Sequence, residues 1–195
     1  MSNLLLNVDY FKDTLSTLKE MSYDSEEKVS MTDSNIQGYN FDLVKRHYTN
    51  SLHLSEEVAK SVDTIYYCEK NNSYIFIEFK NGYMKNEKAN VRQKVRDSLL
   101  MFCDMIHQNI SFTRTNVDLI LVYNKKKNKK NSNDAFPANS QNSDYGREEL
   151  INHLFDLSDE HEILFGLQIF KTLYFRDVFT YNEEEFNAKI NELFI

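Results

Sequence analysis

The feature that most constrains the fold is a pair of β-branched and aromatic runs separated by a short polar segment. The runs span 62–68 and 74–80, and Asn71 and Asn72 lie between them. Asparagine accepts the positive φ angles that a two-residue hairpin turn requires, so the pattern predicts a β-hairpin. The second run is largely apolar on both faces, which is typical of a strand buried on both sides.

Three charged side chains interrupt this apolar hairpin. If Asn71 and Asn72 are the central turn residues, Asp63 falls opposite Lys80, and Glu78 lies one diagonal step away on the same face. Cross-strand Cβ atoms are roughly 5 Å apart and diagonal ones roughly 7 Å, so the two carboxylates can share a divalent cation beside an ammonium. The alternative interpretation is an Asp63–Lys80 ion pair with a solvated Glu78.

Asp63, a gap of fourteen residues and then Glu78-Phe79-Lys80 at the end of an apolar strand resemble the motif of the PD-(D/E)XK, or restriction-endonuclease-like, nuclease superfamily. Val62 stands where that motif has its proline. The resemblance implies an α/β fold with a restriction-endonuclease-like core, a mixed β-sheet flanked by helices. It also implies Mg²⁺-dependent hydrolysis of nucleic-acid phosphodiester bonds, with Mn²⁺ as the substitute ion.

The same resemblance implies roles for individual residues. Asp63, Glu78 and the Phe79 carbonyl would bind the metal, and Lys80 would orient the attacking water or assist its deprotonation. Gln93, on the following helix, is a secondary catalytic candidate, although a surface glutamine is an equal interpretation. Many members of the superfamily add an acid from the first core helix, and here three candidates compete without a preference: Asp42, Glu56 and Glu57.

Hydrophobic periodicity predicts the other elements. We expect helices at 8–21, 41–48, 86–108, 145–157 and 183–194, and further strands at 117–123 and 162–170. Asn40 and Asn182 precede two of these helices as N-caps. The order of hairpin, long helix and buried strand is similar to the superfamily core, where a crossover helix connects the motif strand to the next strand. For the first core strand, 28–31 is the only nearby candidate.

Charge is unevenly distributed along the chain. The net charge of −7 is unfavourable for nonspecific nucleic-acid binding. Residues 80–96, however, hold six basic side chains against one acidic, and 125–130 add five lysines. Such clusters suit contacts to backbone phosphates, and the candidates are Lys85, Lys88, Arg92, Arg96, Lys125, Lys126 and Lys127. The alternative interpretation, which we favour for any one of these residues taken singly, is a solvated surface, in which Lys94 and Arg96 only solvate the outer face of an amphipathic helix.

The 195 residues are expected to form a single domain. Residues 124–144 are rich in Lys, Asn and Ser and predict a flexible insertion. Because no apolar run approaches the roughly 20 residues of a membrane span and no secretory signal is visible, we expect a cytoplasmic protein without membrane contact. Cys68 and Cys103 show no metal-ligand spacing and are expected to be buried thiols.

Two functions remain open at this point. The chain is either a metal-dependent nuclease, with DNA expected in preference to RNA, or a catalytically inactive nuclease-fold protein that acts by protein–protein binding in phage defence or counter-defence. Net acidity and the lack of a recognisable DNA-specificity domain favour the second, whereas two adjacent carboxylates favour the first. Aromatic residues near 174–181, expected to be exposed, would suit a homodimer interface. Four glycines and scattered histidines favour no nucleotide loop or catalytic triad.

Overall fold

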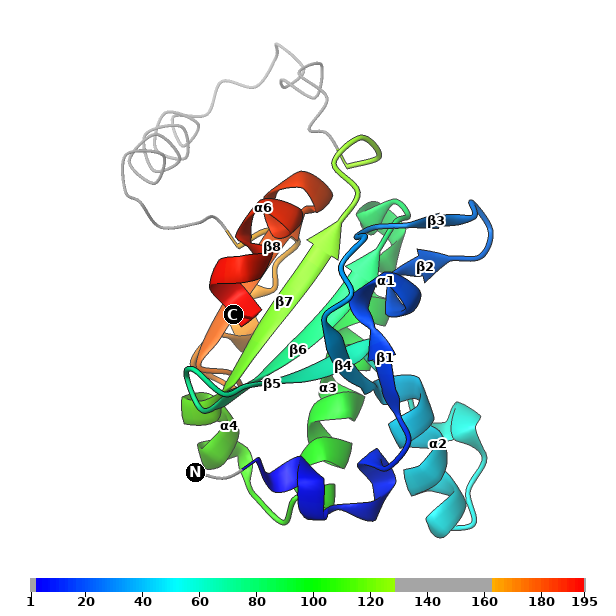
Figure 1. The fold of residues 1–195 in the computed structure, drawn as a ribbon, viewed down its shortest axis with the longest axis vertical. Coiled ribbons are helices and arrows are strands. Elements are labelled where there is room, and N and C mark those ends of the chain that lie inside the picture. Colours follow the sequence, from blue (N-terminus) through cyan, green and yellow to red (C-terminus); the bar gives the residue numbers. More distant parts are fainter. Residues whose placement is uncertain (1–2, 129–162, 195) are drawn as a thin grey trace, which may run out of the picture.

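The structure, a computed structural model, describes residues 3–128 and 163–194. In that part of the chain six strands form one sheet in the order β1-β4-β5-β6-β7-β8 (Figure 1). Neighbours from β1 to β6 pair antiparallel, whereas β6, β7 and β8 run parallel. Two short strands form a separate ribbon. The strands are β1 Leu15–Thr17, β2 Tyr23–Asp24, β3 Val29–Ser30, β4 Gln37–Asn40, β5 Thr64–Cys68, β6 Ser73–Lys80, β7 Val117–Tyr123 and β8 Asp177–Asn182.

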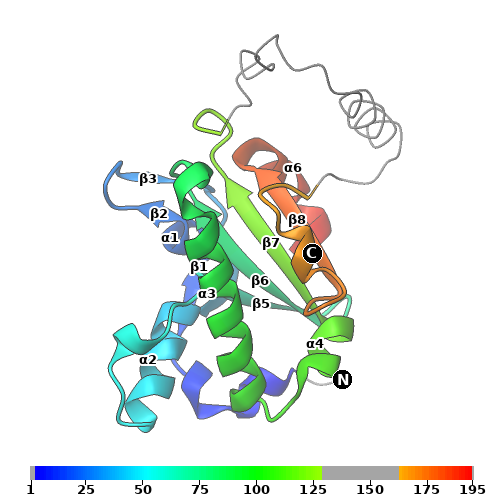
Figure 2. The same cartoon turned by 180° about the vertical axis from the view of Figure 1, so that it is seen from behind.

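Helices cover both faces of the sheet. In Figures 1 and 2, α3 crosses one face and α6 lies on the other. The α-helices are α1 Leu18–Met21, α2 Phe41–Ser51, α3 Met84–Met105, α4 Ile110–Asn116 and α6 Glu183–Phe194. Short 3₁₀ helices are η1 Leu4–Asn7, η2 Asp9–Phe11, η3 Glu56–Val58 and η4 Gln168–Phe170. Among the described helices, none combines the length and apolar character needed to cross a membrane.

The structure confirms the expected α/β class and the central order of elements. Strand β6 is followed by α3 and then by β7, which pairs parallel to β6. The Asn40 side chain accepts hydrogen bonds from the Asp42 and Leu43 amides and so caps α2. At α6, the Asn182 side chain accepts from the Glu184 and Glu185 amides. Local capping chemistry therefore determines where both helices begin.

Side-chain alternation along β6 divides the core into two layers. Phe76 points toward α3 and meets the Phe102 ring edge-on at 5.2 Å between ring centroids. Ile77 and Phe79 point the opposite way, and Phe79 meets Phe186 of α6 at 5.7 Å. Each buried aromatic side chain contributes about 1.5–3 kcal/mol by leaving water. The strand is held from both sides, so the even-numbered side chains on the α3 face, Glu78 among them, have fixed positions.

The predicted hairpin register is wrong by two residues. Cys68 pairs with Ser73, and the loop is the four residues 69–72 rather than a two-residue Asn-Asn turn. Only Asn72 takes a positive φ, 49°, and its amide donates to the Glu69 carbonyl at 3.3 Å. The ladder therefore brings Asp63 level with Glu78, not with Lys80. A shift of two residues keeps every side chain on its face, because the strand period is two.

The predicted N-terminal helix at 8–21 is also wrong. This segment forms η2, the edge strand β1 and the four-residue α1, which begins at a capping box between Thr17 and Glu20. Leu15–Thr17 pairs with residues 37–39 of β4. The candidate first strand at 28–31 lies in the β2–β3 ribbon, so the main sheet is instead extended by β4 and β1.

The predicted strand at 162–170 is not formed in its described part. There the chain turns at Gly166, with φ of 69°, and forms η4, while the strand that joins the sheet is β8. The predicted helix at 145–157 and most of the predicted flexible insertion at 124–144 lie outside the described residues. The first five residues of that insertion are held to the body: the Asn124 side chain donates to Asn81, and Asn128 accepts from the Met84 amide. Cys68 and Cys103 are free, buried thiols, as expected.

Candidate functional site

Asp63 lies at the junction of three elements. It precedes β5, its carbonyl accepts from the Phe41 amide at the start of α2 at 3.1 Å, and its Oδ2 accepts from the Phe79 amide at 2.6 Å. One residue earlier, the Val62 amide donates to Ser98 Oγ on α3 at 2.8 Å. The Asp63 carboxylate is thus fixed against β6 and cannot turn freely toward solvent.

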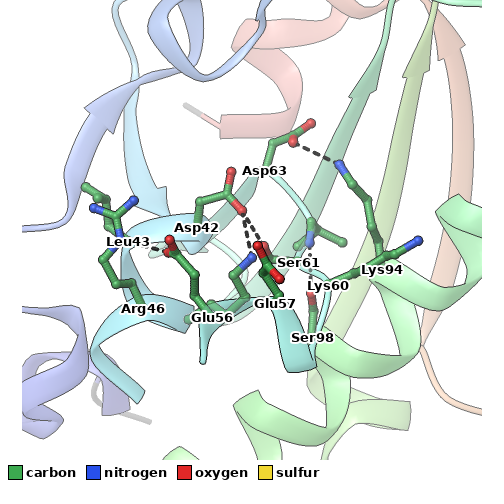
Figure 3. Close-up of polar contacts among 12 residues, drawn as sticks. Asp42, Leu43, Arg46, Glu56, Glu57, Lys60, Ser61, Asp63, Lys94 and Ser98 are labelled. Atoms are coloured by element: carbon green, nitrogen blue, oxygen red, sulfur yellow. Dashed lines mark hydrogen bonds and ion pairs between the residues drawn. The ribbon is translucent and has the colours of Figure 1, made fainter. Parts of the chain in front are cut away.

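Glu78 and Lys94 complete the centre of the site. Glu78 is 1% exposed and lies on the face of β6 that α3 covers. Lys94 Nζ on α3 lies 2.7 Å from Glu78 Oε1 and 3.4 Å from Asp63 Oδ1. Figure 3 shows the Lys94 side chain extending from the helix to Asp63. A single ammonium therefore bridges the Glu78 carboxylate of β6 and the Asp63 carboxylate, which lies immediately before β5.

Burial and mutual charge shift the pKa values of Asp63, Glu78 and Lys94. Burial raises the pKa of both Asp63 and Glu78, and the neighbouring Asp63 carboxylate raises the pKa of Glu78 further. Burial alone would lower the pKa of Lys94, but the two carboxylates outweigh it and raise that pKa above its usual range. Glu78 Oε2 is buried and has no hydrogen-bond partner in the part of the chain that the structure describes. The two acids thus have more acceptor capacity than one ammonium satisfies.

Lys80 shares the α3 face with Glu78 but does not bridge the two acids. Its Nζ contacts Glu87 Oε2 on α3 at 3.0 Å, and the Asn90 side chain donates to the same oxygen at 2.8 Å. These two hydrogen bonds lower the pKa of Glu87. Lys60 Nζ donates to Asn90 Oδ1 at 2.7 Å and extends the chain of contacts. Lys80 is held beside the carboxylates, near enough for its charge to favour the ionised form of Glu78.

Of the three acids considered from the first core helix, Asp42 lies closest to the site. It accepts a hydrogen bond from Ser61, and its charge raises the pKa of Asp63 (Figure 3). Glu56 instead pairs with Arg46 at 2.9 Å, and Glu57 is exposed on η3. Both of these glutamates belong to the 3₁₀ helix rather than to α2.

Gln93 and several of the basic residues predicted to contact phosphates form contacts within the protein instead. Gln93 is exposed and donates to Asp97 at 3.4 Å. Arg92 donates to the Gly166 carbonyl at 3.0 Å and Arg96 lies over the Phe170 ring, so both hold the segment around η4 against α3. Three basic side chains are exposed and form no ion pair within the described chain: Lys85, Lys88 and Lys126. The two others are paired, Lys125 with Glu184 and Lys127 with Glu27.

Lys94 is the residue that sequence reasoning missed. We assigned it to the outer face of the helix, but the structure places it on the face that packs against the sheet. The signal was its spacing, because Val91 and Ser98 are three residues before and four residues after it and both are buried. A lysine within such a stripe must reach a carboxylate, since a buried unpaired ammonium is costly.

The residues present fit a divalent cation with few protein ligands. Asp63 and Glu78 offer the hard oxygen atoms that Mg²⁺ prefers, and Mg²⁺ is typically bound by one or two carboxylates plus waters and substrate phosphates. Glu78 Oε2 is an acceptor that the protein itself leaves unused. Within residues 3–128 and 163–194, no three or more Asp, Glu, His or Cys side chains form a larger ligand group. The two carboxylates therefore fit a metal site in which waters and substrate phosphates supply the remaining ligands.

Comparisons of the chain with protein-family models, with curated proteins and with solved structures found no match.

Proposed function

We propose that this chain is a metal-dependent nuclease with a restriction-endonuclease-like core, and that it hydrolyses phosphodiester bonds in nucleic acid, DNA in preference to RNA. The observation that carries the proposal is the pair formed by the partly buried Asp63 and the fully buried Glu78, which share one cationic group, while Glu78 Oε2 has no hydrogen-bond partner among the described residues. Two carboxylates side by side, one buried and one partly buried, cost stability unless a cation compensates them. The order β5-β6-α3-β7 and the Asp63 and Glu78-Phe79-Lys80 motif support the same assignment.

Each residue of the site would have a role that follows from its position. Asp63, Glu78 and the Phe79 carbonyl would hold Mg²⁺ or Mn²⁺, and such an ion activates water and offsets charge on a phosphoryl group. The Phe79 amide keeps the Asp63 carboxylate aimed at the site through its 2.6 Å hydrogen bond. Glu87 and Asn90 orient Lys80, whose ammonium would add positive charge beside the phosphodiester monoanion or beside an attacking water. Exposed Lys85 and Lys88, on the first turns of α3, would contact the backbone phosphates.

A second candidate function is favoured by one specific observation. Lys94 already supplies a positive charge at the place that a metal ion would take. A nuclease-fold protein that no longer cleaves could retain such an internal ion pair and act by binding another protein. The net charge of −7 suits a protein partner better than a polyanion.

Cleavage assays separate the two functions. The wild-type protein is incubated with single- and double-stranded DNA and RNA in EDTA, Mg²⁺ or Mn²⁺, beside Asp63→Asn and Glu78→Gln. Glu69→Gln, an exposed acid in the loop of the same hairpin, is the matched control. We expect cleavage that requires the metal, a loss of about 100-fold or more in both site variants, and wild-type rates in the control.

The contrary result is equally clear. A folded wild-type protein that cleaves none of these substrates in either metal, and that forms a stable complex with another protein, would establish the second function. Cleavage that persists at the wild-type rate in Glu78→Gln would show that a nuclease is present but that this site does not perform the reaction.

A further inference from the structure

Lys94 is held in its position by the helix that carries it. Ser98, one turn later on the same stripe of α3, accepts from the Val62 amide at 2.8 Å, immediately before Asp63. Val91 and Val95 on either side are packed into the core. Helix α3 is therefore registered against the start of β5, and the Lys94 ammonium reaches the two acids without freedom in the backbone. Only its side chain, with four flexible methylenes, can move away.

The charges of the site do not balance in this arrangement. Two carboxylates face one ammonium, and the nearby Lys80 is engaged by Glu87 at 3.0 Å. Glu78 Oε2 is unpartnered while Oε1 holds Lys94. A divalent ion between the two carboxylates would match their charge and use the idle oxygen. The ammonium contributes half of that charge and occupies the same place.

We propose that Lys94 is an internal competitor for the metal: its ammonium holds the position between Asp63 and Glu78 in the metal-free protein and must withdraw from both before a divalent cation binds there. The inference rests on the proposed function for the identity of the ion. It has two consequences. The metal-free protein stays folded although Glu78 is buried beside Asp63, and metal affinity is set by competition with a tethered ammonium rather than by the carboxylates alone. A variant without the ammonium should therefore be less stable without metal, and added metal should restore its stability.

Lys94→Met tests this directly, because methionine keeps much of the apolar stem and loses the charge. Lys94→Arg keeps the charge, and Lys19→Met, which breaks the exposed 2.9 Å pair with Asp33, is the matched control. Thermal unfolding and calorimetric titration are carried out with Mg²⁺, Mn²⁺ and Ca²⁺ alone, without nucleic acid. In EDTA the Tm of Lys94→Met should fall by about 6 °C or more, because Asp63 and Glu78 lose the ammonium that compensates their charge.

Added metal should restore that Tm, and Lys94→Met should bind Mn²⁺ about tenfold or more tightly than the wild type. Lys94→Arg and Lys19→Met should keep wild-type affinity to within a few-fold. The gain should vanish when Glu78→Gln is added to Lys94→Met. If Lys94→Met is unfolded in EDTA, recovery of its circular dichroism in Mn²⁺ is the readout, with Lys94→Gln as a second variant.

The outcomes separate this inference from the proposed nuclease function. Tighter metal binding by Lys94→Met with no cleavage by the wild type upholds the competitor and rejects the nuclease. Metal-dependent cleavage by the wild type, with equal or weaker metal binding by Lys94→Met, upholds the nuclease and overturns the competitor. The absence of metal binding by wild type, Lys94→Met and Lys94→Gln alike overturns the competitor, as does an unfolded variant that no metal recovers.

Discussion

At the scale of single residues, Glu78 is where burial and charge oppose each other most strongly. Within residues 3–128 and 163–194, this 1% exposed carboxylate forms one ion pair, at 2.7 Å with Lys94, and its second oxygen has no hydrogen-bond partner. Such an arrangement is costly for stability, because replacing a buried ionic group by a neutral one of similar shape is often neutral or stabilising. We interpret the cost as the consequence of a cation-binding role.

The raised pKa of Glu78 makes a prediction about pH. Folding raises this pKa above its ordinary value of 4.5, so at pH values between the unfolded-state and folded-state pKa the folded protein binds more protons at Glu78 than the unfolded chain does. Stability from this group is present below about pH 4.5 and is lost as pH rises toward the folded-state pKa. Between about pH 5 and about pH 8, urea unfolding of Glu78→Gln in EDTA should vary less with pH than that of the wild type, whose unfolding free energy should fall as pH rises.

The measurement has a clear contrary outcome. A wild type whose unfolding free energy rises with pH across this window, and a Glu78→Gln variant that flattens the rise, would mean that folding lowers the pKa of Glu78. Glu69→Gln, in the exposed loop of the hairpin, should reproduce the wild-type profile.

At the scale of elements, sequence patterns predicted the secondary structure correctly where local interactions determine it. They failed where pairing with distant residues determines it. Residues 117–123 and 183–194 form a strand and a helix with the predicted limits, because an apolar run and an Asn182 cap act locally. Leu15–Thr17 instead becomes a strand, since it pairs with residues 37–39, which no helical spacing reveals. The face shared by Asp63 and Glu78 could be predicted from period two, but the register and the position of Lys94 depend on a loop geometry and a helix packing that are tertiary.

Asn182 offers a test at this scale. Its side chain accepts from two amides at the start of α6, and its own amide donates to Glu185 Oε2, which forms a reciprocal cap. Asn182→Ala should lower the free energy of unfolding by about 0.5–2 kcal/mol in urea titrations, because it leaves these amides unpaired. Asn191→Ala, at an exposed position on the same helix, should change it by less than about 0.5 kcal/mol. Equal effects of the two substitutions would mean that the cap does not determine the start of α6.

At the scale of the whole molecule, one sheet joins two apolar layers. Phe102 packs on the α3 side of β6 and Phe186 on the α6 side, and both side chains are fully buried. Since β6 and β7 contribute alternate side chains to both layers, neither layer can open without disturbing the strand that carries Glu78. The site is therefore as stable as the fold, which suits a group of charges that must be held in a fixed geometry.

Phe102→Ala and Phe186→Ala test this coupling. Each should cost about 3–5 kcal/mol and should still unfold in one transition, with circular dichroism and tyrosine fluorescence changing together. Leu100→Ala, at a position that is 65% exposed on α3, should have little effect. Two separated transitions in either phenylalanine variant would show that the layers unfold independently.

The central claim is that Asp63 and Glu78 form a site for a divalent cation, which Lys94 fills when the metal is absent. A crystal structure of the wild-type protein with Mn²⁺, and anomalous scattering recorded at the manganese edge, addresses it most directly. We expect one anomalous peak within about 2–2.5 Å of carboxylate oxygens from both acids, with Lys94 Nζ withdrawn from them. Lys94 still bridging Asp63 and Glu78 at saturating Mn²⁺, with no peak between the carboxylates, would contradict the account.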